Sequence, residues 1–463
     1  MLKNRVQRIH FIGIGGSGMC GIAEILLSLG FTVSGSDLKA GEVTERLAGQ
    51  GARITVGHSA GNLGDAQVVV YSSAVSRDNP EMAAARALGI PVIRRAEMLA
   101  ELMRLKYGVG VAGTHGKTTV TSMSGLVLTE GGLDPTVIIG GRLLSLGGHV
   151  RAGVGDYMVA EADESDASFL VLAPVIAVIT NIDDDHLDHY RSMDRLYGAF
   201  IEFAQKVPFY GSVVVCSDDS GVRKILPELK KRVVTYGFGS DAMVRAEGYE
   251  VTTEGSRFRV TVGGKQAGKF ILSVAGRHNV LNSLAATAVG MELGISIETS
   301  AKALASFSGV ARRLQFKGGG GGVAVYDDYG HHPTEVRATI EALSDRVRLS
   351  GGRLIVLFQP HRFTRTNLLR EAFGGAFESA DHVVITEIYP AGEDPIPGVT
   401  GRSVFDEVKK HGKPPSEFAP DLDTGCALVA RMAKKGDFIL TLGAGDVGRC
   451  GERIIAMLPG GGS

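Results

Sequence analysis

Short apolar runs alternate with amphipathic stretches over the first hundred residues. Apolar strands are expected at 9–14, 32–35 and 68–72, and the spacing of apolar positions at 19–29 and 43–50 indicates helices between them. Strands that alternate with helices in this way are typical of a parallel, doubly wound sheet. This part of the chain is therefore predicted to be an α/β domain.

The alternation starts again twice further along the chain. A second unit is predicted with strands at 107–112, 157–160, 175–180 and 213–216, a β excursion at 246–262 and 270–273, and a helix at 282–293. A third unit has strands at 323–326, 354–358, 383–386 and 438–442, after a glycine run at 318–322 that is predicted to be a linker or hairpin turn. The predicted domains are 1–106, 107–315 and 316–463.

Composition and charge limit the classes of function. The 463 residues carry 49 Lys and Arg against 50 Asp and Glu, so no overall basic surface is available for nucleic acid or an anionic membrane. The four cysteines show no C-x-x-C spacing, no apolar stretch reaches about 18 residues, and the N-terminus is typical of a strand and not of a signal peptide. A cytoplasmic protein that binds anions at local sites is expected.

The first predicted strand runs into the glycine loop Gly13-Ile14-Gly15-Gly16-Ser17-Gly18, which opens a helix. Asp37 follows about 20 residues later, as in dinucleotide-binding folds. Backbone amides at such a helix end bind a pyrophosphate. These residues leave three interpretations open: NAD or FAD binding, binding of a UDP-linked substrate, and a tight turn without a ligand.

A second loop, Gly113-Thr114-His115-Gly116-Lys117-Thr118-Thr119, follows the strand at 107–112. It carries the Gly-Lys-Thr of a P-loop, in which Lys117 contacts the β- and γ-phosphates of ATP and Thr118 contacts Mg²⁺. Val111 replaces the first glycine of the general pattern, so the match is incomplete. A nicotinamide-dependent dehydrogenase has no need of this loop, which favours a UDP-linked substrate at the first loop.

Acidic residues and histidines follow strands of the second and third units. The runs 161–166 and 181–189 are expected at the same sheet edge as the P-loop, where a carboxylate and an imidazole are suited to hold Mg²⁺. The runs 327–333 and 359–365 are expected to share a cleft, in which Arg362 and Arg365 clamp a carboxylate or phosphate. Solvated loops are the alternative for each acidic run.

Together these segments resemble the Mur ligases of bacterial peptidoglycan synthesis. The resemblance rests, in order from His10 to Asp446, on HFIGIGGSGMCGIAE, YSSAV, RRAEMLAELMR, AGTHGKTT, EADESDASFL, TNIDDDHLDHY, GRHNVLNSLAA, DDYGHHPTE, QPHRFTRT and GAGD. It implies a Rossmann-like N-terminal domain for a UDP-sugar, a central P-loop ATPase with a mixed sheet, and a Rossmann-like C-terminal domain for the amino acid. The implied reaction joins L-alanine to the lactyl carboxylate of UDP-N-acetylmuramate through an acyl phosphate, with ATP and Mg²⁺.

The resemblance also implies the site residues. Those for the UDP-sugar are Gly13, Gly15, Gly16, Ser17, Gly18, Met19, Ser36, Asp37, Ser72 and Ser73. Those for ATP are Gly113, Thr114, His115, Gly116, Lys117, Thr118, Thr119, His278, Asn279, Arg313 and Asp328, with Thr118, Glu161 and His186 as magnesium ligands. The acceptor end is assigned to Tyr329, His331, His361, Arg362 and Arg365, and the expected catalytic residues are Lys117, Glu161, His186, His331, Arg362 and Arg365.

Three other functions stay open on the sequence. A relative within the same family attaches a preformed tripeptide to the same UDP-sugar, an NAD-dependent dehydrogenase uses only the first loop, and a nucleotide-binding regulator keeps the fold without catalysis. The expected partners are the small-molecule substrates alone, with no nucleic acid and no membrane, and a monomer or homodimer is expected.

Overall fold

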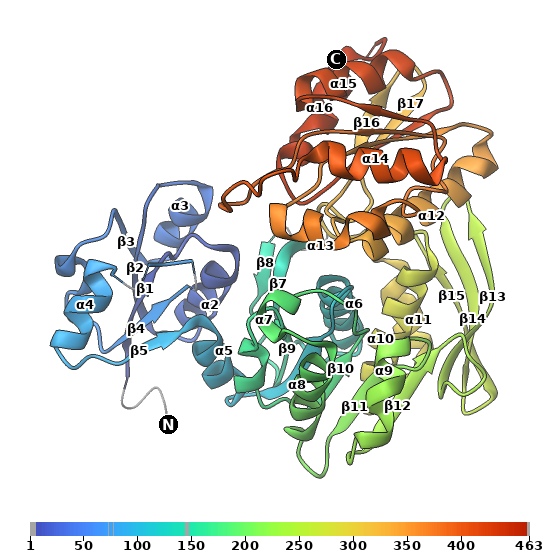
Figure 1. Cartoon of the computed structure of the whole chain (residues 1–463). Coiled ribbons are helices and arrows are strands. Elements are labelled where there is room, and N and C mark those ends of the chain that lie inside the picture. Colours follow the sequence, from blue (N-terminus) through green and yellow to red (C-terminus); the bar gives the residue numbers. More distant parts are fainter. Residues whose placement is uncertain (1–5, 73, 77, 144–147, 461–463) are drawn as a thin grey trace. The chain divides into compact units, whose positions relative to one another are not determined.

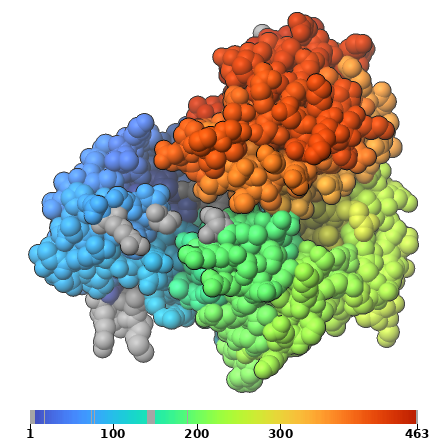
Figure 2. All heavy atoms as spheres, viewed as in Figure 1, coloured from blue at the N-terminus to red at the C-terminus, as the bar shows by residue number. Residues whose placement is uncertain are grey.

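The computed structural model describes residues 6–460 apart from 73, 77 and 144–147, and its elements are labelled in Figure 1, with the same view drawn as spheres in Figure 2. By internal packing the chain forms two compact units. The first comprises Met1–Arg245, Thr261–Gly268 and Leu281–Leu304, and the second comprises Ala246–Val260, Lys269–Val280 and Ala305–Ser463. The predicted domain boundaries therefore stay a prediction.

The first sheet is parallel, in the order β3-β2-β1-β4-β5. Its strands are β1 Arg8–Ile12, β2 Thr32–Asp37, β3 Arg53–Val56, β4 Val68–Tyr71 and β5 Val92–Arg94, and its helices are α2 Ser17–Ser28, α3 Glu42–Gly49, α4 Pro80–Ala87 and α5 Arg95–Met103. Phe11 packs with α2 in one apolar cluster and Ile12 packs with α4 in another, because successive strand residues face opposite sides. The strand order reverses between β1 and β4, where ligands bind in such sheets.

The second sheet is mixed and has the order β15-β14-β13-β12-β11-β10-β6-β9-β7-β8. Its strands are β6 Tyr107–Ala112, β7 Thr136–Leu143, β8 Gly148–Arg151, β9 Tyr157–Glu161, β10 Ile176–Ile179, β11 Ser212–Cys216, β12 Val233–Gly237, β13 Val244–Thr252, β14 Gly255–Val262 and β15 Lys265–Leu272. Its helices are α6 Lys117–Glu130, α7 Leu187–Tyr190, α8 Met193–Gln205, α9 Ser220–Ile225, α10 Arg277–Glu292 and α11 Ile297–Ala305. β6 pairs in parallel with β9 and β10, so the loops after these three strands meet at one edge.

The third sheet has the order β16-β17-β21-β18-β19-β20, and only the β16–β17 pair in it is antiparallel. Its strands are β16 Gln315–Gly320, β17 Val323–Asp328, β18 Leu354–Phe358, β19 His382–Ile385, β20 Ser416–Phe418 and β21 Phe438–Leu442. Its helices are α12 Pro333–Ser350, α13 Phe363–Phe373, α14 Gly401–His411, α15 Leu422–Met432 and α16 Cys450–Met457. Apolar clusters cover both faces, with α12 to α14 on one side and α15 and α16 on the other.

Of the two alternatives predicted for the glycine run at 318–322, the hairpin turn is confirmed and the linker is wrong. The run is not a linker, because Gly318–Gly320 form the end of β16 and pair with β17, and only Gly321 and Gly322 make the turn. Both turn glycines have positive φ, at 58° and 80°, which explains why glycine stands there. Among the described helices, none is long and apolar enough to cross a membrane.

Candidate functional site

The P-loop lies between β6 and α6, at the carboxyl edge of the second sheet. Two of its glycines are required by geometry: Gly113 has a φ of 128° and a Cβ there would collide with Thr180, and Gly116 has a φ of 84° and a Cβ would lie 2.7 Å from Asn282 Oδ1. Gly116 is the N-cap of α6, so the first free amides of this helix face the loop. Such a helix end favours a bound phosphate.

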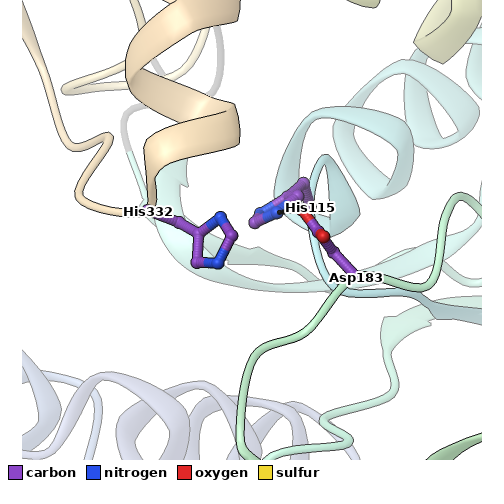
Figure 3. A group of neighbouring side chains, drawn as sticks. All are labelled: His115, Asp183 and His332. Carbon is purple, nitrogen blue, oxygen red and sulfur yellow. Dashed lines mark hydrogen bonds and ion pairs between the residues drawn. The ribbon is translucent and has the colours of Figure 1, made fainter. Parts of the chain in front are cut away.

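The loop after β10 holds the P-loop in place. Asn181 Oδ1 accepts from the His115 amide at 2.8 Å, and Asn181 Nδ2 donates to the His115 carbonyl at 3.0 Å. His115 Nε2 also hydrogen-bonds Asp183 Oδ2 at 3.0 Å, the pair of side chains that Figure 3 shows turned toward each other. The phosphate loop is therefore fixed by protein contacts before any nucleotide binds.

Lys117 begins α6 and has its ammonium surrounded by oxygen atoms. It donates to the Gly113 carbonyl at 2.7 Å and to Glu164 Oε1 at 2.8 Å. Burial alone would lower the pKa of Lys117, but Glu164, with Asp163 and Glu161, raises it above its ordinary value. The lysine is thus charged at neutral pH and held at the loop that would carry phosphates.

Glu164 is a residue that the sequence analysis did not single out. Its side chain is 1% exposed, and its Oε2 is a buried oxygen that has no hydrogen-bond partner in the part of the chain that the structure describes. His186 Nε2 lies 3.8 Å from Glu164 Oε1, and the Tyr190 hydroxyl donates to the Glu164 carbonyl at 2.6 Å, which fixes the backbone. A buried carboxylate oxygen without a partner beside an imidazole fits a divalent cation.

Glu161, the predicted magnesium ligand, ends β9, three residues before Glu164. Its carboxylate contributes less than Glu164 to the raised pKa of Lys117. Both residues belong to the acidic run that the sequence places at this edge, and both carboxylates act on Lys117. Thr118 and Thr119 follow Lys117 in the first turn of α6, as expected for a P-loop.

The first glycine loop connects β1 to α2. Gly13 has a φ of 76° and its amide donates to the Ser36 carbonyl at 2.8 Å, while the Gly15 amide donates to Asp37 Oδ2 at 2.8 Å. Gly16 is the N-cap of α2, which begins at Ser17, and Gly18 lies in its first turn, where a Cβ would crowd the Arg95 side chain. Asp37 therefore lies against the loop.

Two predicted substrate residues here have their side chains occupied elsewhere. The Met19 side chain is 1% exposed and belongs to the apolar core around α2. The Ser36 hydroxyl is buried and donates to Glu81 Oε2 at 2.8 Å. Ser72 follows β4, across the point where the strand order reverses, and Ser73 lies outside the described residues. Only the backbone of Met19 and Ser36 is left for a ligand.

The buried carboxylate of Glu81, in α4, is linked to this loop through Ser36. It is fully buried and receives His10 Nε2 at 2.7 Å, Asn62 Nδ2 at 2.9 Å and the Ser36 hydroxyl. Burial would raise the pKa of Glu81, but the hydrogen bonds of His10, Asn62 and Ser36 lower it to about 2. The sequence analysis missed Glu81 because no motif marks it.

Four of the predicted nucleotide residues lie in the second compact unit, among them Asp328 at the end of β17 and Arg313, which acts on it. Asp328 accepts from the amides of Leu314 at 2.8 Å and Gly330 at 2.7 Å. Burial raises its pKa to about 6, against the opposing charge of Arg313. His278, in the first turn of α10, has its pKa lowered to about 4 by burial and then by Arg313, so this imidazole is neutral at pH 7. Asn279 Nδ2 donates to the Ala275 carbonyl at 2.7 Å.

The acceptor residues of the second unit form a row of rings. Tyr329 and His331 are 5.6 Å apart between ring centroids, His331 and His361 are 5.6 Å apart, and His361 stacks on Tyr389. His332, also drawn in Figure 3, caps α12 and accepts from the Thr334 amide at 3.3 Å. Three of the predicted residues, which follow two different strands, thus lie together. Tyr389, which the sequence analysis did not name, lies beside them.

The predicted arginines stand at the start of α13. Arg362 is its N-cap with a φ of 70°, and Arg365 Nη1 donates to His361 Nδ1 at 3.3 Å. Burial, Arg365 and Arg362 together lower the pKa of His361 to about 4. Arg362 Nε lies 3.9 Å from Glu393. A neutral imidazole beside two guanidinium groups makes this end of the sheet suited to an anionic ligand.

Comparisons with known proteins agree with this geometry. Residues 8–107 match the Mur ligase family, catalytic domain, residues 111–290 match the Mur ligase middle domain, and residues 312–445 match the Mur ligase, glutamate ligase domain. The UDP-N-acetylmuramate–L-alanine ligase of Solibacter usitatus is 51% identical over 456 residues, which is 98% of this chain and 96% of that protein.

Two solved structures share the architecture. The UDP-N-acetylmuramate-alanine ligase of Thermotoga maritima is 31% identical with a TM-score of 0.79, over 97% of this chain and 98% of that one. A murein peptide ligase of Psychrobacter arcticus has a TM-score of 0.71 over the same shares, at 23% identity, and so shows the fold alone. The predicted fold class and the resemblance are confirmed: this chain belongs to the Mur ligase family.

Proposed function

We propose that this chain joins L-alanine to the lactyl carboxylate of UDP-N-acetylmuramate, converting ATP to ADP and phosphate. The observation that carries the proposal is the contact of Lys117 with the buried carboxylate of Glu164, which also lies near His186. The chain that holds this site is 51% identical to an alanine-adding ligase over 98% of its length. The tripeptide-adding alternative is supported by a solved ligase of that kind from Neisseria meningitides, which is 31% identical over 66% of this chain, a weaker match than that to the alanine-adding ligase. We assign the reaction to peptidoglycan synthesis in the cytoplasm.

The first step is phosphoryl transfer. A carboxylate oxygen of the UDP-sugar attacks the γ-phosphorus of ATP, the bond from that phosphorus to the β,γ-bridging oxygen breaks, and ADP leaves. Lys117 stabilises the charge on the phosphoryl oxygens because its ammonium is already held at the loop. Mg²⁺ bound by Glu164, His186 and Thr118 would neutralise the same oxygens; we assign Glu164 to this role in place of Glu161.

The second step is acyl transfer. The neutral amine of L-alanine attacks the acyl phosphate carbonyl, a tetrahedral intermediate forms, and phosphate leaves as the amide bond is made. The amine must lose a proton in this step. We assign the binding of the amino acid carboxylate to Arg362 and Arg365, beside the neutral His361. The first glycine loop then holds the UDP group and not a dinucleotide.

The test is an ADP-release assay with UDP-N-acetylmuramate, Mg²⁺ and a panel of amino acids, with the tripeptide as a further acceptor. L-Alanine is expected to stimulate ADP release well above the other acceptors. Stimulation by the tripeptide alone would identify the recycling activity, and no stimulation by any acceptor would reject the ligase. A Lys117→Ala variant should lose turnover and keep binding of the UDP-sugar, because the two loops follow different sheets.

A further inference from the structure

A cavity of about 190 Å³ lies at the edge of the second sheet opposite to the P-loop. Its lining includes Tyr107, Tyr157 and Ser212, which are the first residues of β6, β9 and β11. The P-loop and Glu164 follow the carboxyl ends of β6 and β9 instead. Since β6 has six residues, the two places are about 20 Å apart along this strand. The cavity is thus no part of the nucleotide site.

The walls of the cavity are aromatic. The rings of Tyr107 and Tyr157 are 5.7 Å apart between centroids, and Tyr210 lines another side. Tyr107 is 52% exposed and Tyr210 is 61% exposed, so neither ring is buried in the apolar core. Ligand pockets are mostly lined by such rings, with a few polar groups that orient the ligand. Tyrosine faces around a hollow favour a planar aromatic guest.

Two polar features of the lining decide the charge of that guest. Arg232 Nη2 lies 2.8 Å from Glu292 Oε1, so these two charges neutralise each other and leave no net charge for an ionic ligand. Ser212 is 1% exposed, and its Oγ has no hydrogen-bond partner within the described chain. A buried hydroxyl without a partner costs stability. This hydroxyl lies just behind the cavity surface, so the side chain must rotate for a guest to satisfy it.

We propose that this cavity is a second small-molecule site, which takes a neutral planar aromatic compound of one or two rings with one hydrogen-bonding group. The aromatic rings of Tyr107, Tyr157 and Tyr210 contact the faces of the guest, and Ser212 Oγ bonds its polar group. The volume agrees, because an apolar cavity of about 150 Å³ holds a benzene molecule. The site is independent of the ligase reaction proposed above.

Indole is a suitable probe, because it has two rings and one N–H donor. The chain contains no tryptophan, so indole fluorescence excited beyond the tyrosine band reports the ligand alone. Titration of the full chain is expected to show saturable binding. Ser212→Ala should weaken it about 2- to 10-fold, the value of one hydrogen bond, and Tyr210→Ala should weaken it about 3- to 10-fold by loss of a ring contact.

Phe209→Ala is the matched control, because Phe209 is 95% exposed beside Tyr210 but does not line the cavity. Its affinity for indole should equal that of the unmodified chain. The proposal is overturned if indole shows no saturable binding, if Ser212→Ala and Tyr210→Ala bind as tightly as the unmodified chain, or if ATP displaces the indole. Should Ser212→Ala fail to fold, Tyr210→Ala decides alone, since its exposed side chain is not needed for folding.

Discussion

The ammonium of Lys117 donates a hydrogen bond to Glu164 Oε1 at 2.8 Å. The other carboxylate oxygen of Glu164 is buried without a hydrogen-bond partner within the described residues. The same carboxylate therefore contacts the lysine of the P-loop with one oxygen and has its other oxygen buried without a hydrogen bond. We therefore propose Glu164 as a magnesium ligand, where the resemblance implies Glu161.

The first prediction compares these two glutamates. Glu164→Gln is expected to lower kcat about 100-fold or more and to raise the Mg²⁺ concentration needed for half-maximal ADP release, because an amide is a poor ligand for a hard cation. Glu161→Gln should have a clearly smaller effect on both values. Mg²⁺ titrations of ADP release for the three proteins measure this. Equal effects of the two substitutions would contradict the assignment, and a larger effect of Glu161→Gln would return the role to Glu161.

The second prediction concerns Glu81 and acid stability. Its folded-state pKa of about 2 lies below the ordinary 4.5, so its stabilisation is present above pH 4.5 and is lost as the pH falls through 2. Glu81→Gln should therefore lower the free energy of unfolding at pH 7 by roughly 3 kcal/mol. Urea unfolding of both proteins across this range should show the two stabilities converging in acid. A constant difference at every pH would contradict the account.

The third prediction is a pKa measurement on His361. Burial, Arg365 and Arg362 lower its pKa to about 4, so the imidazole should stay neutral well below pH 6 in an NMR titration. Arg365→Gln removes the nearer positive charge and should raise this pKa, and Arg362→Gln should raise it less. Because the folded-state pKa lies below the ordinary 6.5, the contribution of His361 to stability is present above pH 6.5 and lost as the pH falls through 4. An unchanged pKa in Arg365→Gln would refute the stated cause.

The fourth prediction compares two glycines with positive φ. Gly116, at 84°, would bring a Cβ 2.7 Å from Asn282 Oδ1, while Gly132, at 78°, has open space around it. Gly132→Ala should cost about 1 kcal/mol of stability, the strain of the backbone alone. Gly116→Ala should cost at least about 2 kcal/mol and also weaken ATP binding, because Asn282 must move. Thermal unfolding and ATP titration check this. Similar results for the two variants would show that the Asn282 side chain moves aside at no cost.

The sequence predicted two apolar strands well, since β6 and β18 have the predicted bounds. At 318–322 it left a linker or a hairpin turn open, and the hairpin turn is confirmed at Gly321 and Gly322. It did not predict that Gly318–Gly320 belong to a strand, because glycine content alone does not distinguish a turn from a strand whose backbone pairs across a sheet. Motifs also identified Lys117 and His186, which lie together in space. They did not identify Glu164, because its position beside His186 depends on the path of the chain after β9. They did not identify Glu81, because its contact with His10 depends on packing between distant segments.

The hydrogen bonds from Asn181 and Thr180 to the P-loop have a kinetic consequence. The loop is ordered by folding, so nucleotide capture at this loop needs no ordering step. The association rate constant should then be set by diffusion and charge, with little dependence on the loop itself. Differences in affinity among variants of the loop should appear mainly as differences in residence time.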